Sequence, residues 1–392
     1  MKPISMAKLS SIGLAVVLPI LSFSSSATDA RSMAMGGTGV ASASYLTAPF
    51  FNPAQLTSYN GSDDFGLLLP AVAVTAHDKD ELFDKIDHFQ DLDDQLKQNP
   101  SDKALEAQWK DALKALDNAS VKAEVQLGLA VSIPNQYLSV SLFSQANVAL
   151  MATTLVDGDD LNSPDPDNMK SKAHAMAGGT VDVGLALARE FALPFEGQTL
   201  AVGVSPKLQH IVALNYKNTV SGFEEDDFNA EDEYTEKSGI NIDAGVTYKP
   251  WETVSVGFAA RNLISEELLT NASGPAAEGA TPVTYLVEPQ YAMGMAYDNG
   301  WFSIALDADL NAKRYFKESK YETQYARVGI ELDAWEWAQL RAGYSLSMTD
   351  YAQDTFSAGI GLKPFGAFGI DLGAQYGEDN NFGVAAQLVF TL

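Results

Sequence analysis

The amino-acid sequence predicts an all-β transmembrane barrel of about 14 antiparallel strands. Three observations support this prediction: an N-terminal export signal, segments of roughly ten residues in which apolar and small or polar side chains alternate, and connections that are by turns long and short. After the export signal, no apolar stretch approaches the roughly 18 residues that would suggest a membrane-spanning helix. A barrel needs no such stretch, because only alternate residues of each strand face lipid.

Residues 1–27 have the composition of a secretory signal peptide. Lys2 and Lys8 precede a short apolar stretch, which is followed by a run of small residues. The apolar stretch is too short to span a bilayer, which favours a cleaved signal over an N-terminal anchor. Cleavage after Ala27 or after Ala30 satisfies the small-residue rule, and we expect Ala27. The protein is therefore expected to be exported.

Alternation with a period of two residues marks the strands. Val328, Ile330 and Leu332 lie on one face of a strand, whereas Arg327 and Glu331 lie on the other. The same pattern predicts strands at 65–76, 121–133, 136–150, 180–191, 198–216, 238–249, 253–262, 284–298, 301–312, 322–333, 337–347, 354–364, 366–377 and 382–392. Residues 65–392 are therefore assigned to the barrel.

The connections distinguish a membrane barrel from a soluble β-sandwich, whose strands also alternate. The first connections are long at 77–120, short at 134–135, long at 151–179, short at 192–197 and long at 217–237. Outer-membrane barrels have short periplasmic turns and longer extracellular loops, and an even number of strands. This pattern predicts both termini on the periplasmic side of the outer membrane of a Gram-negative bacterium, with membrane lipid and lipopolysaccharide as partners.

Aromatic residues gather at the predicted short turns. Four of the 5 tryptophans, Trp251, Trp301, Trp335 and Trp337, lie in or beside these turns, which is typical of an interfacial girdle. The last predicted strand alternates as barrel-closing strands do, but Phe390 is third from the end and Leu392 is last. This is a modest departure from the usual terminal Phe, and we expect the barrel-assembly machinery to be a partner.

Composition excludes several classes of protein. With no cysteine there is no disulfide, thiol nucleophile, iron–sulfur cluster or thiolate zinc site. A net charge of -26 argues against nucleic acid as a partner. The 4 histidines lack metal-ligand spacing, and no nucleophile elbow or phosphate loop is present. We predict no enzyme activity, no cofactor and no specific metal site. The acidic runs at 157–167 and 224–233 fall in predicted extracellular loops, where they suit solvation or loose divalent bridging to lipopolysaccharide phosphates.

The long connection 77–120 is predicted to be a helical hairpin in the first extracellular loop. Apolar residues recur there at helical spacing on both sides of Asn99-Pro100, and Ser101 is a suitable N-cap for the second helix. In one interpretation the two apolar faces pack on each other and cover the mouth of the barrel. In the other they line an access groove for an apolar ligand, with Leu82, Phe83, Ile86, Phe89 and Trp109 as its candidate contacts.

Two short motifs follow the signal. The segment 31–40 reads Arg-Ser-Met-Ala-Met-Gly-Gly-Thr-Gly-Val, and an Asn-Pro-Ala turn lies further on. This resembles the start of the FadL-like outer-membrane family, which includes fatty acid and aromatic hydrocarbon transporters. The matching residues are Met35, Gly36, Gly37, Gly39, Asn52, Pro53 and Ala54. The chain is most similar to the FadL-related group named conjugal transfer protein TraF. It does not resemble the thioredoxin-like protein of the same name, because it has no cysteine and no βαβ pattern.

The resemblance implies that residues 28–64 fold into the barrel as a plug. A 14-strand barrel is too wide to be filled by wall side chains alone, so its lumen must hold water or protein. Glycines permit close backbone approach, and Asn52-Pro53 favours a turn. The alternative is an ordinary extension in the periplasm. The motif residues are accordingly the predicted plug and gate.

Charged residues on predicted lumen faces are expected to hold the plug and walls together rather than to catalyse a reaction. They are Asp307, Asp309, Arg327, Arg341 and Asp371. Two functions remain open. The resemblance suggests passive uptake of a hydrophobic small molecule, of the fatty acid or hydrocarbon class, through a plugged lumen. The alternative is an envelope component of conjugal plasmid transfer or surface contact.

Overall fold

The computed structural model describes residues 29–61, 63–162, 165–166, 168–223, 234–333, 337–364 and 366–392. The predicted signal peptide, the acidic run at 224–233 and Trp335 lie outside these residues. Within them, no helix is both long and apolar enough to cross a membrane.

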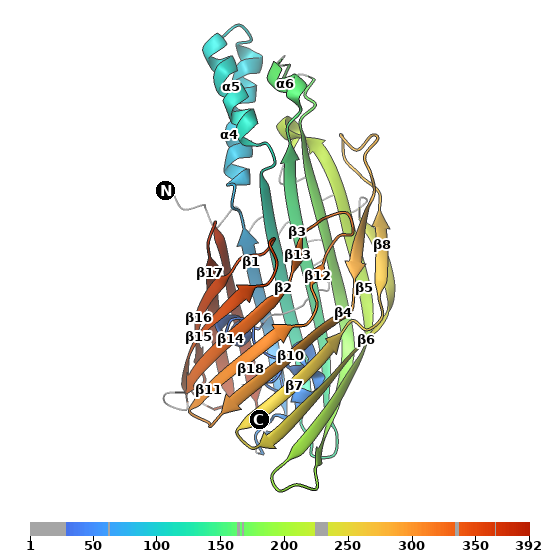
Figure 1. Cartoon of the computed structure of the whole chain (residues 1–392), viewed down its shortest axis with the longest axis vertical. Coiled ribbons are helices and arrows are strands. Elements are labelled where there is room, and N and C mark those ends of the chain that lie inside the picture. The colour runs from blue at the N-terminus through green and yellow to red at the C-terminus, as the bar shows by residue number, and fades with distance from the viewer. Residues whose placement is uncertain are drawn as a thin grey trace.

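Fourteen antiparallel strands form a closed barrel, as predicted, because β1 pairs with both β2 and β18. The strands are β1 (Gly66–His77), β2 (Ser120–Ile133), β3 (Ser139–Leu155), β4 (Lys172–Ala192), β5 (Thr199–Thr219), β6 (Thr235–Trp251), β7 (Val254–Arg261), β10 (Gln290–Asp298), β11 (Phe302–Asp309), β14 (Tyr325–Asp333), β15 (Ala338–Ser347), β16 (Thr355–Leu362), β17 (Phe368–Gly377) and β18 (Asn381–Thr391). The C-terminus lies at the end with the short turns (Figure 1). Closure leaves no unpaired edge in lipid.

Strands β3, β4 and β5 rise well above the rest of the barrel as a tall wall (Figure 1). They contain 17, 21 and 21 residues, whereas β7, β11 and β16 contain 8 each. The predicted strand 180–191 starts earlier, at Lys172, than its alternation suggests. Alternation fades there because both faces of the wall are covered by protein and carry small or apolar residues.

The predicted strand 284–298 is wrong as a single element. The structure divides it into β9 (Val283–Val287) and β10, with Glu288 and Pro289 between them. Proline has no N–H for a continuous ladder. β9 pairs instead with β8 (Glu266–Thr270), and β12 (Lys313–Arg314) pairs with β13 (Glu322–Thr323). Residues from these pieces pack on the inner face of the tall wall, in a cluster comprising Met151, Met176, Ile211, Ala213, Leu268, Val283, Tyr285, Val287, Tyr315 and Phe316.

The helical hairpin consists of α4 (Leu82–Gln98) and α5 (Lys103–Ala115). Its second helix is capped by Asp102, which accepts hydrogen bonds from two backbone amides, and not by the predicted Ser101. Trp109 Nε1 donates to Asp93 Oδ1 at 2.7 Å inside the hairpin. At its base, Asp78 Oδ1 accepts from the Leu82 amide, and burial raises the pKa of Asp78 to about 6.

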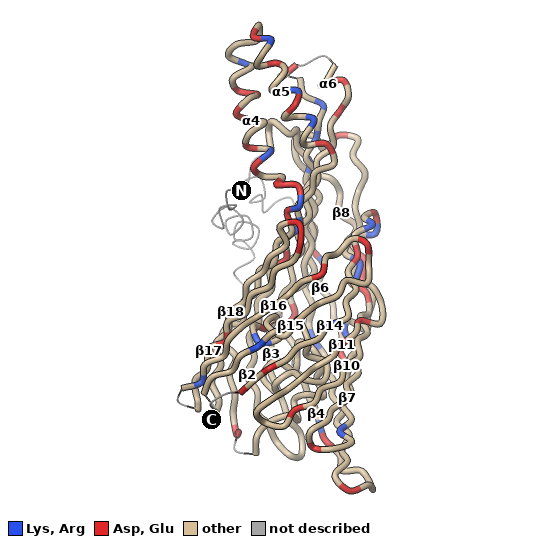
Figure 2. The backbone as a smooth tube through the Cα atoms, turned by 60° about the vertical axis from the view of Figure 1, so that its left-hand side comes forward, with Lys and Arg blue, Asp and Glu red and all other residues tan. Residues whose placement is uncertain are grey.

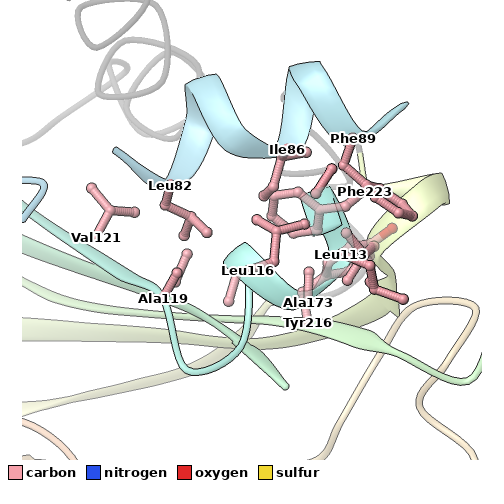
Figure 3. Close-up of a cluster of buried hydrophobic side chains, with 14 of the residues drawn as sticks. Leu82, Ile86, Phe89, Leu113, Leu116, Ala119, Val121, Ala173, Tyr216 and Phe223 are labelled. Carbon is pink, nitrogen blue, oxygen red and sulfur yellow. The ribbon is translucent and has the colours of Figure 1, made fainter. Parts of the chain in front are cut away.

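The hairpin packs on the outer face of the tall wall. On this face of β5, Leu208 is 66% exposed, but Leu214, six residues further along, is 1% exposed because the helices cover it. Figure 3 shows the helix side chains lying over Ala173 and Tyr216 of the wall. The two apolar faces of the hairpin do pack on each other, as one interpretation expected, but the expected cover over the barrel mouth is wrong. The wall rises above the barrel with an apolar outer face, and the helices shield that face.

Short helices complete the chain. They are α2 (Ala30–Ala34), α3 (Ala48–Phe51), η1 (Pro53–Thr57), α6 (Gly158–Asn162) and η2 (Val220–Gly222). Figure 2 shows acidic residues along the projecting hairpin. In α6, Asp160 accepts hydrogen bonds from the amides of Lys170 and Ser171, so this carboxylate of the predicted acidic loop is satisfied by protein donors.

Candidate functional site

The N-terminal segment Ala30–Thr57, hereafter the luminal segment, lies inside the barrel. α2 packs against β15, β16, β17 and β18, while η1 packs against β3, β4, β5 and β6 on the opposite side. Most of its residues are buried, including Met33, Met35 and Phe50 at 0–2% exposure. Asp29 caps the N-terminus of α2, because its side chain accepts a hydrogen bond from the Ser32 amide. The segment thus crosses the lumen from wall to wall.

Eight glycines on the inner face form a belt against which the luminal segment rests. They come from eight strands: Gly203, Gly245, Gly257, Gly294, Gly329, Gly343, Gly359 and Gly373. A Cβ at Gly343 would lie 2.2 Å from the Gly36 nitrogen, and one at Gly257 would lie 2.5 Å from the Val40 oxygen. Such approaches are possible only without side chains. The belt therefore makes room for the backbone of the segment.

The predicted Gly-rich motif forms the turn after α2. Gly36 and Gly37 have φ of 71° and 83°, a region that favours glycine. Gly36 donates its amide to Ser357 and accepts at its carbonyl from Ser345. Met35 is fully buried below them. These residues hold the segment against β15 and β16 by backbone contacts.

The predicted Asn-Pro-Ala turn joins two parts of the segment to the wall. Asn52 Oδ1 accepts the Ala54 amide at 3.0 Å, and its Nδ2 donates to the Val40 carbonyl at 2.8 Å and to Thr247 Oγ1 at 3.2 Å. Pro53 starts η1, where a missing amide costs nothing. Asn52 is fully buried with these contacts in place. The turn therefore holds two parts of the luminal segment together and attaches them to β6.

A partly buried ionic chain joins the segment to β14, β15 and β17. Arg31 donates Nε and Nη2 to the two oxygens of Glu331 at 2.9 and 3.0 Å. Glu331 also pairs with Arg341, which pairs with Asp371. The sequence did not single out Arg31 and Glu331 as site residues. Glu331 lies directly opposite Arg341 across β14 and β15, a charge complementarity that could have identified it.

The other predicted lumen charges also face inward. Asp307 Oδ2 accepts the amides of Gly39 and Val40 at 2.7 and 2.9 Å, which fixes the middle of the segment. Arg327 forms a two-pronged pair with Asp309, at 2.6 and 2.9 Å. All five predicted charges therefore lie in the lumen, in two groups.

A cavity of about 320 Å³ lies in the lumen between the luminal segment and the inward-folded pieces. Met33, Gly36, Val40 and Phe50 contribute from the segment. The other contributors include the aromatic side chains of Tyr285, Tyr315, Phe316, Tyr321 and Tyr325. Its volume is within the range of small-molecule sites. Sequence reasoning missed this aromatic lining, because Tyr315 and Tyr321 lie in a segment that was expected to be a plain loop.

Sequence comparison gives a family. The profile described as "F plasmid transfer operon, TraF, protein" matches residues 49–309. The chain belongs to this TraF family. The match spans β1 to β11 and confirms the resemblance seen in the N-terminal motif. No curated protein matches the chain.

Solved structures with the same fold include channels described as hydrocarbon transporters. The toluene transporter TbuX of Ralstonia pickettii has a TM-score of 0.55 at 12% identity, over 93% of this chain and 97% of that one. A TodX deltaS2S3 mutant, described as a monoaromatic hydrocarbon channel, has a TM-score of 0.53 at 13% identity, over 93% of this chain and 97% of that one. The toluene transporter TodX of P. putida has a TM-score of 0.51 at 12% identity, over 93% of this chain and 98% of that one. At such identities the likeness concerns the fold.

In this TraF family barrel the predicted contacts of an access groove lie in the hairpin. Leu82, Ile86, Phe89 and Trp109 are buried at 0–4% exposure among each other and against the tall wall, with Phe83 packed beside them. None of the five lines the lumen cavity. The structure therefore brings together the motif residues and the lumen charges, and it places the hairpin residues in a separate core outside the wall.

Proposed function

We propose that this protein is a passive uptake channel for a hydrophobic small molecule in the Gram-negative outer membrane, with the luminal segment as its plug. The observation that carries this proposal is the luminal segment itself, which crosses the lumen beneath an aromatic-lined cavity. The hydrocarbon channels and toluene transporters that share the fold support it. The protein acts after cleavage of residues 1–27, inserted among lipid and lipopolysaccharide by the barrel-assembly machinery, and it is not an enzyme.

The contacts of the segment suit a plug that moves. Asp307, Asn52 and Glu331 hold it by hydrogen bonds and ion pairs, which can exchange for water when the segment shifts. Apolar ligand surface buried in the cavity would provide affinity at about 25 cal/mol per Å². The segment would then control passage from cavity to periplasm.

Deleting residues 31–56 is expected to increase passage through the barrel severalfold, because the lumen of a 14-strand barrel is otherwise wide enough for water. Purified protein in liposomes would be measured for single-channel conductance and for uptake of radiolabelled toluene. Replacing the hairpin 81–116 by a short Gly-Ser turn is the control, since the hairpin lies outside the wall. Unchanged conductance and uptake in the deletion variant would refute the plug.

A second function rests on the family and on the hairpin. The description of the matching family names the F plasmid transfer operon. The hairpin projects from the barrel (Figure 1), and its residues do not line the lumen cavity. The hairpin would then be a contact surface in conjugal transfer. The Gly-Ser replacement is expected to lower plasmid transfer between cells while leaving toluene uptake intact. A knockout strain with a normal plasmid transfer frequency but impaired growth on hydrocarbons would dismiss this function.

A further inference from the structure

The cavity contains two lysines, each lying over a tyrosine ring. Lys122 Nζ is 4.0 Å from the ring centroid of Tyr321, and Lys313 Nζ is 4.4 Å from that of Tyr315. The two rings stack on each other at 5.5 Å with an interplanar angle of 23°. All four residues line the cavity. Each ring of the stack therefore has a lysine ammonium group over it, in contact with the lumen.

Other cavity cations are already neutralised or occupied. Arg327 pairs with Asp309, Arg314 pairs with Glu288, and Arg261 donates to the Phe50 carbonyl. Lys122 Nζ likewise donates to a backbone carbonyl, that of Tyr351, at 3.3 Å. The two lysines therefore differ from Arg327 and Arg314 in having no carboxylate partner among the described residues.

Neither Lys122 nor Lys313 forms an ion pair within the described part of the chain. The nearby Glu124 accepts the Tyr315 hydroxyl at 2.6 Å, and Asp307 is engaged by the luminal segment. Burial lowers the pKa of Lys313, as expected for an ammonium with little compensation. In a chain of net charge -26, the cavity thus holds two lysine ammonium groups that no carboxylate contacts directly among the described residues, with the Glu124 carboxylate lying nearby.

We infer that this cavity binds a planar aromatic molecule carrying one negative charge, such as an aromatic carboxylate. This inference rests on the proposed uptake function and specifies its ligand. The carboxylate would accept a hydrogen bond from the ammonium group of Lys122 or of Lys313, and such a charge-assisted hydrogen bond is stronger than one between neutral groups. The ring would pack on Tyr321 and Tyr325, which line the cavity and are only partly buried. The charge selects the ligand, and the aromatic lining provides most of the buried area.

The test compares two ligands of the same shape. Binding of 2-naphthoate and of its neutral isostere 2-naphthamide would be measured by calorimetry on the full barrel in detergent. We expect 2-naphthoate to bind about tenfold tighter, since one charge-assisted contact is worth that ratio. The Lys122→Met/Lys313→Met double variant should lose this preference, whereas Lys122→Arg/Lys313→Arg should keep it. Lys317→Met is the matched control, because Lys317 is an exposed neighbour paired with Glu267.

The outcomes separate this inference from the proposed function. Equal binding of the two ligands, or a preference that survives the double Met variant, overturns the anionic ligand. Toluene uptake that depends on residues 31–56 would in that case still support the channel. Heat-modifiable migration on gels would verify that each variant is a closed barrel, and the Arg variant provides the same test if the Met variant does not fold.

Discussion

Replacing Gly245 by valine is expected to displace the luminal segment and open the barrel. A Cβ at this position would lie 1.9 Å from Asn52 Oδ1 and 3.1 Å from Pro53 Cδ. The wall cannot yield, because β6 is hydrogen-bonded on both sides within a closed barrel. Overpacking of this kind costs about 1–3 kcal/mol, which corresponds to roughly 5- to 150-fold more frequent opening of the segment. Hydrogen exchange of residues 50–57 and single-channel conductance would both increase.

Gly239→Val is the matched control for this experiment. Gly239 lies in the same strand and on the same face, but its added Cβ would meet only the end of the Glu266 side chain, at 3.7 Å. In this variant, hydrogen exchange of residues 50–57 and single-channel conductance should equal those of the wild type. Equal behaviour of the two valine variants would show that the glycine belt does not seat the segment.

The Glu331→Ala variant is expected to release the N-terminal part of the luminal segment. It leaves Arg31 without its two-pronged partner and Arg341 with only Asp371, inside the lumen. Breaking a buried ion pair by removing one partner costs about 3–5 kcal/mol, and we expect the lower end of this range because the Arg31 and Glu331 side chains remain 20% and 14% exposed. Amide exchange in residues 30–40 should therefore accelerate by roughly 100-fold or more. Mass spectrometry of the exchanged protein would measure this effect.

Two further variants show whether the faster amide exchange comes from the unpaired charge that Glu331→Ala leaves on Arg31. The Arg31→Ala/Glu331→Ala double variant also removes the unpaired guanidinium of Arg31. Amide exchange in residues 30–40 should therefore be slower than in Glu331→Ala, although still faster than in the wild type. Glu267→Ala removes one partner of an exposed pair with Lys317 and should change exchange by less than about a factor of five. A Glu331→Ala variant whose segment exchanges like that of the wild type would contradict an anchoring role for the ionic chain.

Much of the fold could be predicted because lipid imposes a period of two on every spanning strand. The strands that follow this pattern cleanly, such as 337–347, match the structure closely in β15. Prediction failed where protein replaces lipid as the neighbour. The upper parts of β3 to β5 carry apolar residues on both faces, and β9 folds inward, so alternation does not mark their bounds.

The candidate site was predicted in part for a related reason. The motif at 35–39 and the turn at Asn52 were visible as glycine, asparagine and proline in a chain that otherwise alternates. Arg31 and the tyrosine stack were not, because their significance depends on partners 300 and 191 residues away: Glu331 for Arg31, and Glu124 for Tyr315.

Local alternation and turn length were enough to predict the barrel, its number of strands and the inward placement of the five lumen charges. They could not predict where the hairpin packs, which glycines face the luminal segment or which cations line the cavity without a carboxylate partner. Those features depend on which strands are neighbours around the closed barrel and how high each one rises, and residues distant in sequence meet only once the barrel has closed.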